Sequence, residues 1–447
     1  MTTHTPDFSQ LGVPAGLVKS LTASGITSPF PIQTATLPDT LDGRDVLGRG
    51  RTGSGKTLAF SLPLVARLAE GGRARAARPR GLVLAPTREL ATQIAATIEP
   101  LAKAAGLSHT VIFGGVSQVS QVKALRGGID IVVACPGRLE DLLGQREIDL
   151  GAVEIAILDE ADHMADLGFL PVVRRLMDRI PRGGQRMLFS ATLDRGVDVL
   201  VKRYLDDPIT HAVDSAESPV SAMTHHLFEV PDVGAKRDLV RTLASGLGRS
   251  LLFTRTKHQA KKLARQLTAD GIPAVDLHGN LSQNARQRNL AAFSAGEARV
   301  LVATDIAARG IHVDDVSLVV HVDPPAEHKA YLHRSGRTAR AGAGGVVVTI
   351  LTPDQRRDVA ALTRAAKIKA QAIRPTDEQV GAIVGPVAPK VKPAPVAQQQ
   401  QRPQQARRSQ PRQQGAPRQQ REGQSGSRPA RGGHQSRRRS GQPSRSR

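Results

Sequence analysis

A glycine-rich segment, Gly-Arg-Thr-Gly-Ser-Gly-Lys-Thr at 50–57, restricts the fold of this chain more than any other feature. Its glycines at 53 and 55 permit a turn in which successive backbone N–H groups surround a phosphate, and Lys56 brings a positive charge to the outer phosphate oxygens. Thr57 offers a hydroxyl to Mg²⁺ and begins a pattern that predicts a helix over 57–63, whose N-terminal dipole favours the same anion. We therefore expect a nucleoside triphosphate site in an α/β fold.

A short acidic segment farther along the chain extends this expectation. Asp159-Glu160-Ala161-Asp162 follows the apolar run 155–158, which predicts a buried strand. Ligands of open α/β sheets usually bind at the carboxyl ends of the strands, so Asp159 and Glu160 should lie near the phosphate loop. One carboxylate there can hold a metal ion and its neighbour can orient water, which predicts hydrolysis of the triphosphate.

Strand-length apolar runs occur in two series with helical patterns between them. The first series comprises 81–85, 129–133, 154–158 and 186–189, and the second comprises 250–253, 274–277, 299–302, 318–321 and 346–350. Continuously apolar strands separated by helices indicate parallel sheets covered on both faces. The polar, proline-containing stretch between the series predicts two domains, 1–214 and 222–375, joined by a linker at 215–221. Over 376–447 Gln, Arg, Pro, Gly and Ser dominate, which predicts a disordered basic tail.

The charge of the chain favours a polyanionic partner. The net charge of +22 and a pI near 11.1 make nucleic acid the default. Lys and Arg outnumber Asp and Glu by 15 to 1 over 381–447 but only by 47 to 39 before it, so the excess lies in the tail. Only 11 residues are aromatic and none follows Tyr331, so we expect backbone contacts rather than base stacking.

Other features narrow the class of protein. The single cysteine, Cys135, excludes an internal disulfide framework, and no H-E-x-x-H or C-x-x-C pattern supports a zinc site. The N-terminus carries no apolar stretch of the kind found in signal peptides or membrane spans. We therefore expect a cytoplasmic protein with no membrane partner.

The order of the motifs resembles the DEAD-box family of ATP-dependent RNA helicases, of bacterial type, from Phe8 to about Leu351. The matching motifs are Phe8 with 25–33 (the Q motif, 8–33), the phosphate loop, Pro-Thr-Arg-Glu-Leu at 86–90, Gly114-Gly115, Pro136-Gly137-Arg138, 159–162, Ser-Ala-Thr at 190–192, Phe-Thr-Arg-Thr at 253–256, His278-Gly279 with Gln283 and Arg286, 303–310, and His-Arg-Ser-Gly-Arg-Thr-Ala-Arg at 333–340. The resemblance implies two tandem RecA-like parallel-sheet domains ahead of the tail.

The resemblance also implies ATP and Mg²⁺ as cofactors. ATP would be bound by Phe8, Gln33, Arg51, Thr52, Gly53, Ser54, Gly55, Lys56, Thr57, Gly310 and His312, with the Gln33 amide reading the adenine edge. Mg²⁺ would be held by Thr57 and Asp159. Catalysis is assigned to Lys56, Asp159, Glu160, Arg337 and Arg340, and coupling to RNA is assigned to Asp162, Ser190, Thr192 and His333. The arginines from Arg334 to Arg340 are three apart, so on a helix they share one face and can meet a γ-phosphate.

RNA is the partner that the resemblance implies, held without sequence preference. Its contacts would be Thr87, Arg88, Gly115, Gly137 and Arg138 in the first domain, with Gly279, Gln283, Arg286, Thr304 and Asp305 in the second. Glycines permit close approach of a sugar-phosphate chain and arginines pair with phosphates. The basic tail would tether RNA, and ribosomal or RNA-decay complexes are candidate settings.

Three departures from the family pattern stand out: Gly50-Arg51 replaces Ala-Gln, Cys135 replaces Thr, and His312 replaces an Asp that accepts hydrogen bonds from the ribose. The main hypothesis is an ATPase that opens short RNA duplexes locally. One alternative is an ATP-gated RNA clamp or annealing factor with little net unwinding, which would carry the same motifs. A second alternative, a DNA helicase, is disfavoured by the segment around Gln33 and by the sequence at 159–162.

Overall fold

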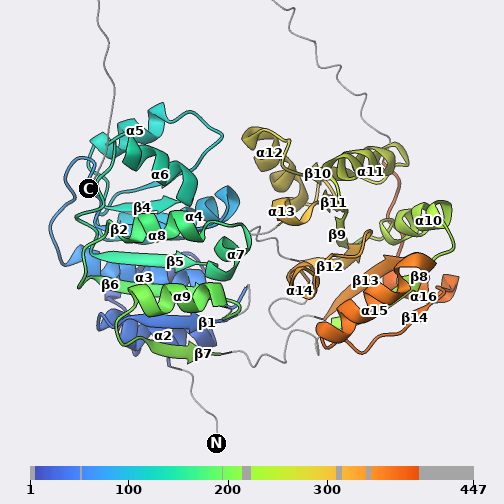
Figure 1. Cartoon of the computed structure of the whole chain (residues 1–447), viewed down its shortest axis with the longest axis horizontal. Coiled ribbons are helices and arrows are strands. Elements are labelled where there is room, and N and C mark those ends of the chain that lie inside the picture. Colours follow the sequence, from blue (N-terminus) through green and yellow to red (C-terminus); the bar gives the residue numbers. More distant parts are fainter. Residues whose placement is uncertain are drawn as a thin grey trace, which may run out of the picture. The chain divides into compact units, whose positions relative to one another are not determined.

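The computed structural model describes residues 6–50, 53–193, 195–213, 223–308, 315–338 and 344–391. These residues fall within one unit, Met1–Ala394, that contains two seven-stranded sheets (Figure 1). The predicted linker at 215–221 and the tail beyond 391 lie outside the described residues. Within the described ranges, no helix is long and apolar enough to cross a membrane.

The first sheet has the strand order β3-β4-β2-β5-β6-β1-β7, and every neighbouring pair is parallel. Its strands are β1 Val46–Arg49, β2 Gly81–Leu84, β3 His109–Ile112, β4 Ile131–Ala134, β5 Ile155–Asp159, β6 Gln185–Ser190 and β7 Ile209–Ala212. Because all strands run the same way, all their carboxyl ends lie along one edge of the sheet. The phosphate loop and the acidic segment follow two of these ends.

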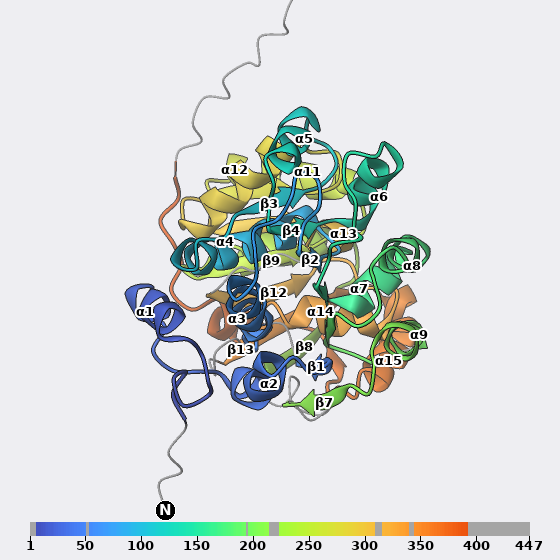
Figure 2. The ribbon, with the colours of Figure 1, turned by 90° about the vertical axis from the view of Figure 1, so that its left-hand side faces the viewer.

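Helices cover both faces of this sheet. They are α1 Ala15–Ala23, α2 Pro31–Leu41, α3 Lys56–Ala69, α4 Arg88–Ala104, α5 Val119–Arg126, α6 Pro136–Gly144, α7 Ala161–Asp166, α8 Leu170–Met177 and α9 Arg195–Tyr204. Side chains alternate along a strand, so Val83 packs in the core under α1–α4 while Leu82 and Leu84 pack in the core under α5–α9. Figure 2 shows α1, α3 and α4 on one side of the strands and α6–α9 on the other.

The second sheet repeats this plan with the order β10-β11-β9-β12-β13-β8-β14. Its strands are β8 Met223–Glu229, β9 Arg249–Phe253, β10 Ala274–Leu277, β11 Val300–Ala303, β12 Val316–His321, β13 Gly345–Leu351 and β14 Ala372–Ile373. Its helices are α10 Val233–Leu243, α11 Lys257–Ala269, α12 Gln283–Ser294, α13 Asp305–Ala308, α14 His328–Ser335, the 3₁₀ turn η1 Pro353–Gln355, α15 Arg356–Ala365 and α16 Asp377–Val384. Two cores again lie on opposite faces of the strands. The predicted pair of α/β domains with parallel sheets is confirmed.

Two boundaries differ from the sequence prediction. Helix α3 continues past Pro63 to Ala69, because the apolar residues on both sides of the proline pack in the core and offset the hydrogen bond that the proline cannot make. The predicted tail was too long at its start, since residues 377–384 form α16, whose Val380 is buried in the core with Leu239 and Leu243 of α10. The backbone N–H of Val391 also donates to the carbonyl of Gly271 at 2.9 Å, so residues up to Val391 pack on the second sheet's domain.

Candidate functional site

The phosphate loop connects β1 to α3 and has the backbone that the sequence predicts. Gly53 and Gly55 have positive φ angles of 86° and 90°, a conformation that costs glycine little. Lys56 is buried with 7% of its surface exposed, and its Nζ donates to the carbonyl of Gly50 at 2.7 Å. The buried Ser54 hydroxyl has no hydrogen-bond partner among the described residues, so the loop retains an unused polar group. Such a loop can accept an anion.

Gln33 joins this loop to the start of α2. Its Oε1 accepts from the backbone N–H of Phe30 at 2.8 Å, and its Nε2 donates to the carbonyl of Gly55 at 2.9 Å. The side chain is fully buried, and a Cβ added at Gly55 would lie 2.6 Å from its Nε2. Phe8, the other predicted member of this motif, is buried in the core beneath α1–α4. Gln33 therefore supports the loop from inside the protein, and Phe8 is part of the core.

The acidic pair stands at the carboxyl end of β5, as predicted. Burial raises the pKa of Asp159 to about 7; the negative charges of Glu160 and Asp162 add to this effect, and the positive charge of Lys56 opposes it. A carboxyl group with this pKa gains from a cation beside it. Burial also acts to raise the pKa of Glu160, but the hydrogen bond and charge of His163, with the charges of Arg337 and Lys56, bring it down to about 2. Glu160 is therefore an anion at neutral pH.

His163 is a functional candidate that the sequence analysis missed. Its Nδ1 lies 3.1 Å from Oε2 of Glu160, one turn away on α7, and only 4% of the His163 side chain is exposed. The spacing of three residues was a usable signal, because residues i and i+3 meet on a helix. Glu160 itself has a positive φ of 50°, which turns the chain sharply between β5 and α7.

Three of the four predicted coupling residues, Asp162, Ser190 and Thr192, form one connected network. Oδ2 of Asp162 accepts from both the backbone N–H and the hydroxyl of Thr192, at 3.0 and 2.9 Å. The hydroxyl of Ser190 accepts from the backbone N–H of Asp162 at 3.3 Å and donates to the carbonyl of Thr192 at 2.8 Å. The segment after β6 is thus fixed to the segment after β5.

The RNA residues predicted in the first domain lie at the same edge of the sheet. Thr87 caps α4 by accepting from the N–H of Leu90, and the guanidinium of the next residue, Arg88, covers Gly115 so closely that an added Cβ would lie 2.1 Å from it. Arg138, at the start of α6, donates from both Nη atoms to the carbonyl of Val116 at 3.3 Å. Gly137 has open space beside it.

In the second domain, Gln283 and Arg286 stand in the first turn of α12, and Gly279 again has open space beside it. Arg286 Nε donates to Glu89 at 2.7 Å, and Gln283 exchanges hydrogen bonds of 3.2 Å with Arg88 and Glu89. The carbonyl of Thr304 accepts from the N–H groups of Ala307 and Ala308, which places it at the start of α13.

Asp305 holds an arginine inside the protein. It accepts two hydrogen bonds from Arg334, at 2.5 and 2.8 Å, and Arg334 also donates to the carbonyl of Asp323. The carboxylate is therefore engaged by a buried guanidinium, of which 4% is exposed.

The expectation that the arginines from 334 onward share a helix face is wrong. Helix α14 ends at Ser335, where the N–H of Gly336 bonds to Leu332, and Arg337 follows in a turn. Arg337 is 6% exposed and its Nε donates to the carbonyl of His333 at 3.3 Å. The helix therefore ends before Arg337, with Gly336 as its C-cap. Five further predicted residues lie outside the described residues: Arg51, Thr52, Gly310, His312 and Arg340.

Comparison with known proteins agrees with this geometry. A family model described as DEAD/DEAH box helicase matches residues 30–200, and one described as helicase conserved C-terminal domain matches residues 235–342. The chain is 41% identical over 366 residues to the chloroplastic DEAD-box ATP-dependent RNA helicase 3B of Zea mays, a match covering 80% of this chain and 49% of that protein. The chain spans about half the length of the curated relatives that it matches first.

Two solved structures extend the comparison. S. cerevisiae Dbp5 bound to RNA and ADP BeF3 has a TM-score of 0.73 and 28% identity, over 84% of this chain and 99% of that one. A DEAD box protein from the hyperthermophile Methanococcus jannaschii has a TM-score of 0.50 and 31% identity, over 82% of this chain and 99% of that one. Both similarities span the two sheets described above.

Proposed function

Because the chain belongs to the DEAD-box helicase family, we propose that it is an RNA-dependent ATPase that opens or remodels RNA duplexes and RNA–protein complexes. The observation that carries the proposal is the connection between the catalytic and coupling groups. Asp159, Glu160 and Asp162 stand in one stretch of four residues beside the phosphate loop, and Asp162 is bonded to Thr192. A change at the phosphate site can therefore reach the segment after β6 through two bonds.

The residues present fit a nucleotide with Mg²⁺. The positive-φ glycines, the orphaned Ser54 hydroxyl and the Lys56 ammonium together suit a triphosphate. Thr57 and Asp159 would hold Mg²⁺, an ion usually bound in proteins by one or two side chains plus phosphate oxygens. Bound Mg²⁺ would neutralise charge that develops on those oxygens. Glu160, an anion held by His163, would orient the attacking water.

Adenine recognition by Gln33 follows the family assignment, with Phe8 packed beneath that motif. Arg51, Thr52, Gly310 and His312 complete the proposed ATP site from the sequence alone. Arg337 and Arg340 would supply positive charge to the γ-phosphate, and His333 would couple them to the rest of the site.

RNA would lie along the carboxyl edges of both sheets. Of the ten contacts assigned from the family, those with open space or an exposed guanidinium nearby, such as Gly137, Arg138 and Gly279, suit a sugar-phosphate chain most directly. Binding of this kind does not depend on the RNA sequence. The positive charge of the tail beyond 391 would help to hold the RNA near the two domains. The proposal also includes a cytoplasmic location, membership of the bacterial type of the family, and ribosomal or RNA-decay complexes as partners. The maize relative reported above, by contrast, is chloroplastic.

The test compares Glu160→Gln with Lys56→Ala in ATP hydrolysis and in strand displacement. Lys56→Ala should abolish hydrolysis, whereas Glu160→Gln should retain ATP and RNA but stall, because only the water-orienting charge is lost. The control is Glu140→Gln, which removes an exposed carboxylate paired with Arg175. Hydrolysis by Glu160→Gln at the original rate would refute the role of Glu160. Hydrolysis without strand displacement would favour the clamp, and equal stimulation by single-stranded DNA would favour a DNA helicase.

A further inference from the structure

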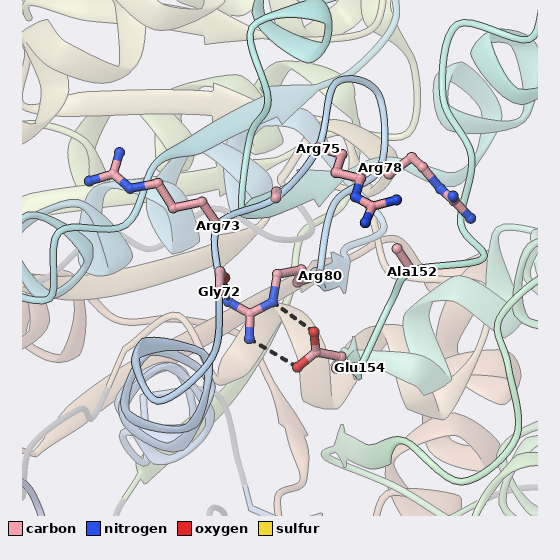
Figure 3. Close-up of a pocket in the computed structure, with 8 residues that line it drawn as sticks. Gly72, Arg73, Arg75, Arg78, Arg80, Ala152 and Glu154 are labelled. Atoms are coloured by element: carbon pink, nitrogen blue, oxygen red, sulfur yellow. Dashed lines mark hydrogen bonds and ion pairs between the residues drawn. The ribbon is translucent and has the colours of Figure 1, made fainter.

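The first domain carries a large hollow on the edge opposite the phosphate loop. One part of about 300 Å³ is formed by the loop 72–80 with Ala152 and Glu154, and is shown in Figure 3. A second part of about 1190 Å³ continues from the same Ala152 and Glu154 over the segments at 43–45, 177–186 and 203–206. We call the two parts together the amino-end hollow, because they border the residues that precede β1, β2, β5 and β6.

This hollow is separate from the candidate nucleotide site. The four strands that border it contain 4 to 6 residues each. At about 3.3 Å per residue, roughly 13 to 20 Å of sheet separate its edge from the edge that holds Asp159 and Ser190. A molecule bound in the hollow would therefore not occupy the phosphate loop.

Positive charge is concentrated in the hollow. Nine arginines line it, against four acidic residues and no lysine. Residues 1–214 as a whole contain 24 Lys and Arg against 23 Asp and Glu, so the domain is close to neutral. The excess of five positive charges in the hollow is thus offset elsewhere on the domain. Segregation of this kind marks a surface that attracts a polyanion.

The arginine-rich loop is held in place before any partner binds. Arg80 donates to both carboxylate oxygens of Glu154, at 2.7 and 3.0 Å, and to the carbonyl of Leu68 at 2.8 Å. The N–H of Ala74 donates to Asp130 at 2.9 Å, and Ala77 bonds through its N–H to Leu125 at 2.8 Å. A fixed loop loses less conformational freedom on binding than a mobile one.

Four of the lining arginines have no acidic partner among the described residues: Arg67, Arg73, Arg75 and Arg182. Arg73, Arg75 and Arg182 are exposed, and Figure 3 shows Arg73 extending from one side of the loop and Arg75 from the other. Arg80 and Arg78, by contrast, pair with Glu154 and Asp149. The paired arginines thus hold the loop, while Arg73, Arg75 and Arg182 present their guanidinium groups to solvent.

We propose that the amino-end hollow is a second RNA-binding surface, which holds the phosphodiester backbone of RNA that extends beyond the carboxyl edge. Guanidinium groups form planar, two-pronged hydrogen bonds with phosphates, and an all-arginine set fits that chemistry. An acidic protein partner fits less well, because none of the large exposed hydrophobic residues of the described chain lines the hollow and protein interfaces depend on apolar anchors. The choice of RNA rests on the proposed function.

The experiment removes the three exposed, unpaired arginines in the full chain, as Arg73→Gln, Arg75→Gln and Arg182→Gln together. The matched control removes three charges from exposed lysines outside the hollow, as Lys19→Gln, Lys103→Gln and Lys123→Gln. The affinity for a short and a long oligouridylate is measured across a salt series. With the long RNA, the arginine variant should lose about 2 units of the slope of log K against log [salt], at ~0.7 per lost phosphate contact. The short RNA should bind both variants alike.

Three outcomes would overturn the proposal. One is an unchanged slope for the arginine variant, and another is an equal loss in the lysine control, which would make the effect one of bulk charge. The third is displacement by polyglutamate in preference to RNA, which would assign the hollow to an acidic protein. The stimulation of ATP hydrolysis by the short RNA is measured in parallel. If the unmodified chain shows no such stimulation, the proposed function is refuted rather than the role of the hollow. Urea unfolding of each variant checks that the loop change leaves the domain folded.

Discussion

Replacement of Gln33 by leucine separates a structural role of this residue from its proposed role in reading adenine. Both ends of the amide are bonded within the protein, to the N–H of Phe30 and the carbonyl of Gly55. Leucine has a similar size but can make neither bond. We therefore expect the phosphate loop and the start of α2 to be less stable in Gln33→Leu even when no ATP is present.

The magnitude follows from what each partner loses. The carbonyl of Gly55 keeps its bond from the N–H of Ala59 at 3.3 Å, so its loss is one hydrogen bond, about 0.5 to 1.5 kcal/mol. The N–H of Phe30 donates to Gln33 and would lose this acceptor in the variant, and an unsatisfied N–H group costs about 1 to 3 kcal/mol of stability. The Phe30 residue is 48% exposed, so water can reach its N–H and bring that figure to its lower end. A total loss of about 2 kcal/mol is expected, or roughly 4 to 8 °C in Tm.

Hydrogen exchange measured by mass spectrometry, without nucleotide, is the appropriate assay because it reports the loop and α2 separately from the second domain. Amides in 30–37 and 55–59 should exchange roughly 30-fold faster in Gln33→Leu, the factor that corresponds to about 2 kcal/mol. Thr36→Val is the matched control, because it removes one buried bond within the same helix, from Oγ1 to the carbonyl of Ile32 at 2.8 Å. If the exchange rates of Gln33→Leu are unchanged but its ATP binding is weaker, the structural role is refuted and adenine recognition is the only role that remains.

Two further predictions concern coupling and pH. Thr192→Val removes one of the two hydrogen bonds to Asp162, and a hydrogen bond to a charged group contributes about 1.5 to 3 kcal/mol. We therefore expect the stimulation of ATP hydrolysis by RNA to fall about tenfold while the basal rate of hydrolysis stays unchanged. An equal fall in both rates would contradict the coupling role, and Thr192→Ser should restore the stimulation. Burial, together with the charge of His226, lowers the pKa of His225 to about 4, whereas an unfolded histidine titrates near 6.5. Stability from this residue is complete above pH 6.5 and falls as pH decreases toward 4, by at most ~1.4 kcal/mol per pH unit. Urea unfolding from pH 7 to pH 4 should show a shallower pH dependence in His225→Gln than in the unmodified chain, and an identical dependence would exclude His225 as the cause.

Central strands such as β2 and β5, and the phosphate site, were predictable because their signals are local. The runs that form β2 and β5, Gly81–Leu84 and Ile155–Asp159, are buried on both faces of the sheet, and that burial demands nearly continuous apolar residues. The predicted series did not include β1, β3, β7, β8 and β14. The edge strands β3 and β7 are only half-buried and carry polar residues such as His109 and Thr210. Strand order was also beyond the sequence, since it depends on contacts between residues far apart in the chain.

The end of α14 and the start of the tail show a different limit. Spacing alone placed Arg334 and Arg337 on one helix, but a helix end depends on the backbone around Gly336, which the periodicity of the arginines does not report. Residues 377–384 directly precede the Gln-, Arg- and Pro-rich tail and were therefore assigned to it. They form a helix because Val380 packs against apolar residues of α10 and because a capping box at Thr376 stabilises the first turn. A single buried side chain and two hydrogen bonds decided that boundary.

The functional residues at the two edges of the first sheet differ in how easily they can be recognised from the sequence. At the carboxyl edge, each functional group lies at the end of a strand or in the loop that follows it, so Lys56, Asp159 and Ser190 can be recognised from short motifs. At the amino edge, the arginines of the hollow come from five separate segments, and only one of them, 73–80 with its four arginines, is conspicuous by itself. Their net charge is also hidden by a domain that is neutral overall. A surface assembled in this way becomes visible only when the fold brings the segments together, and it is therefore where a structure adds most to a family assignment.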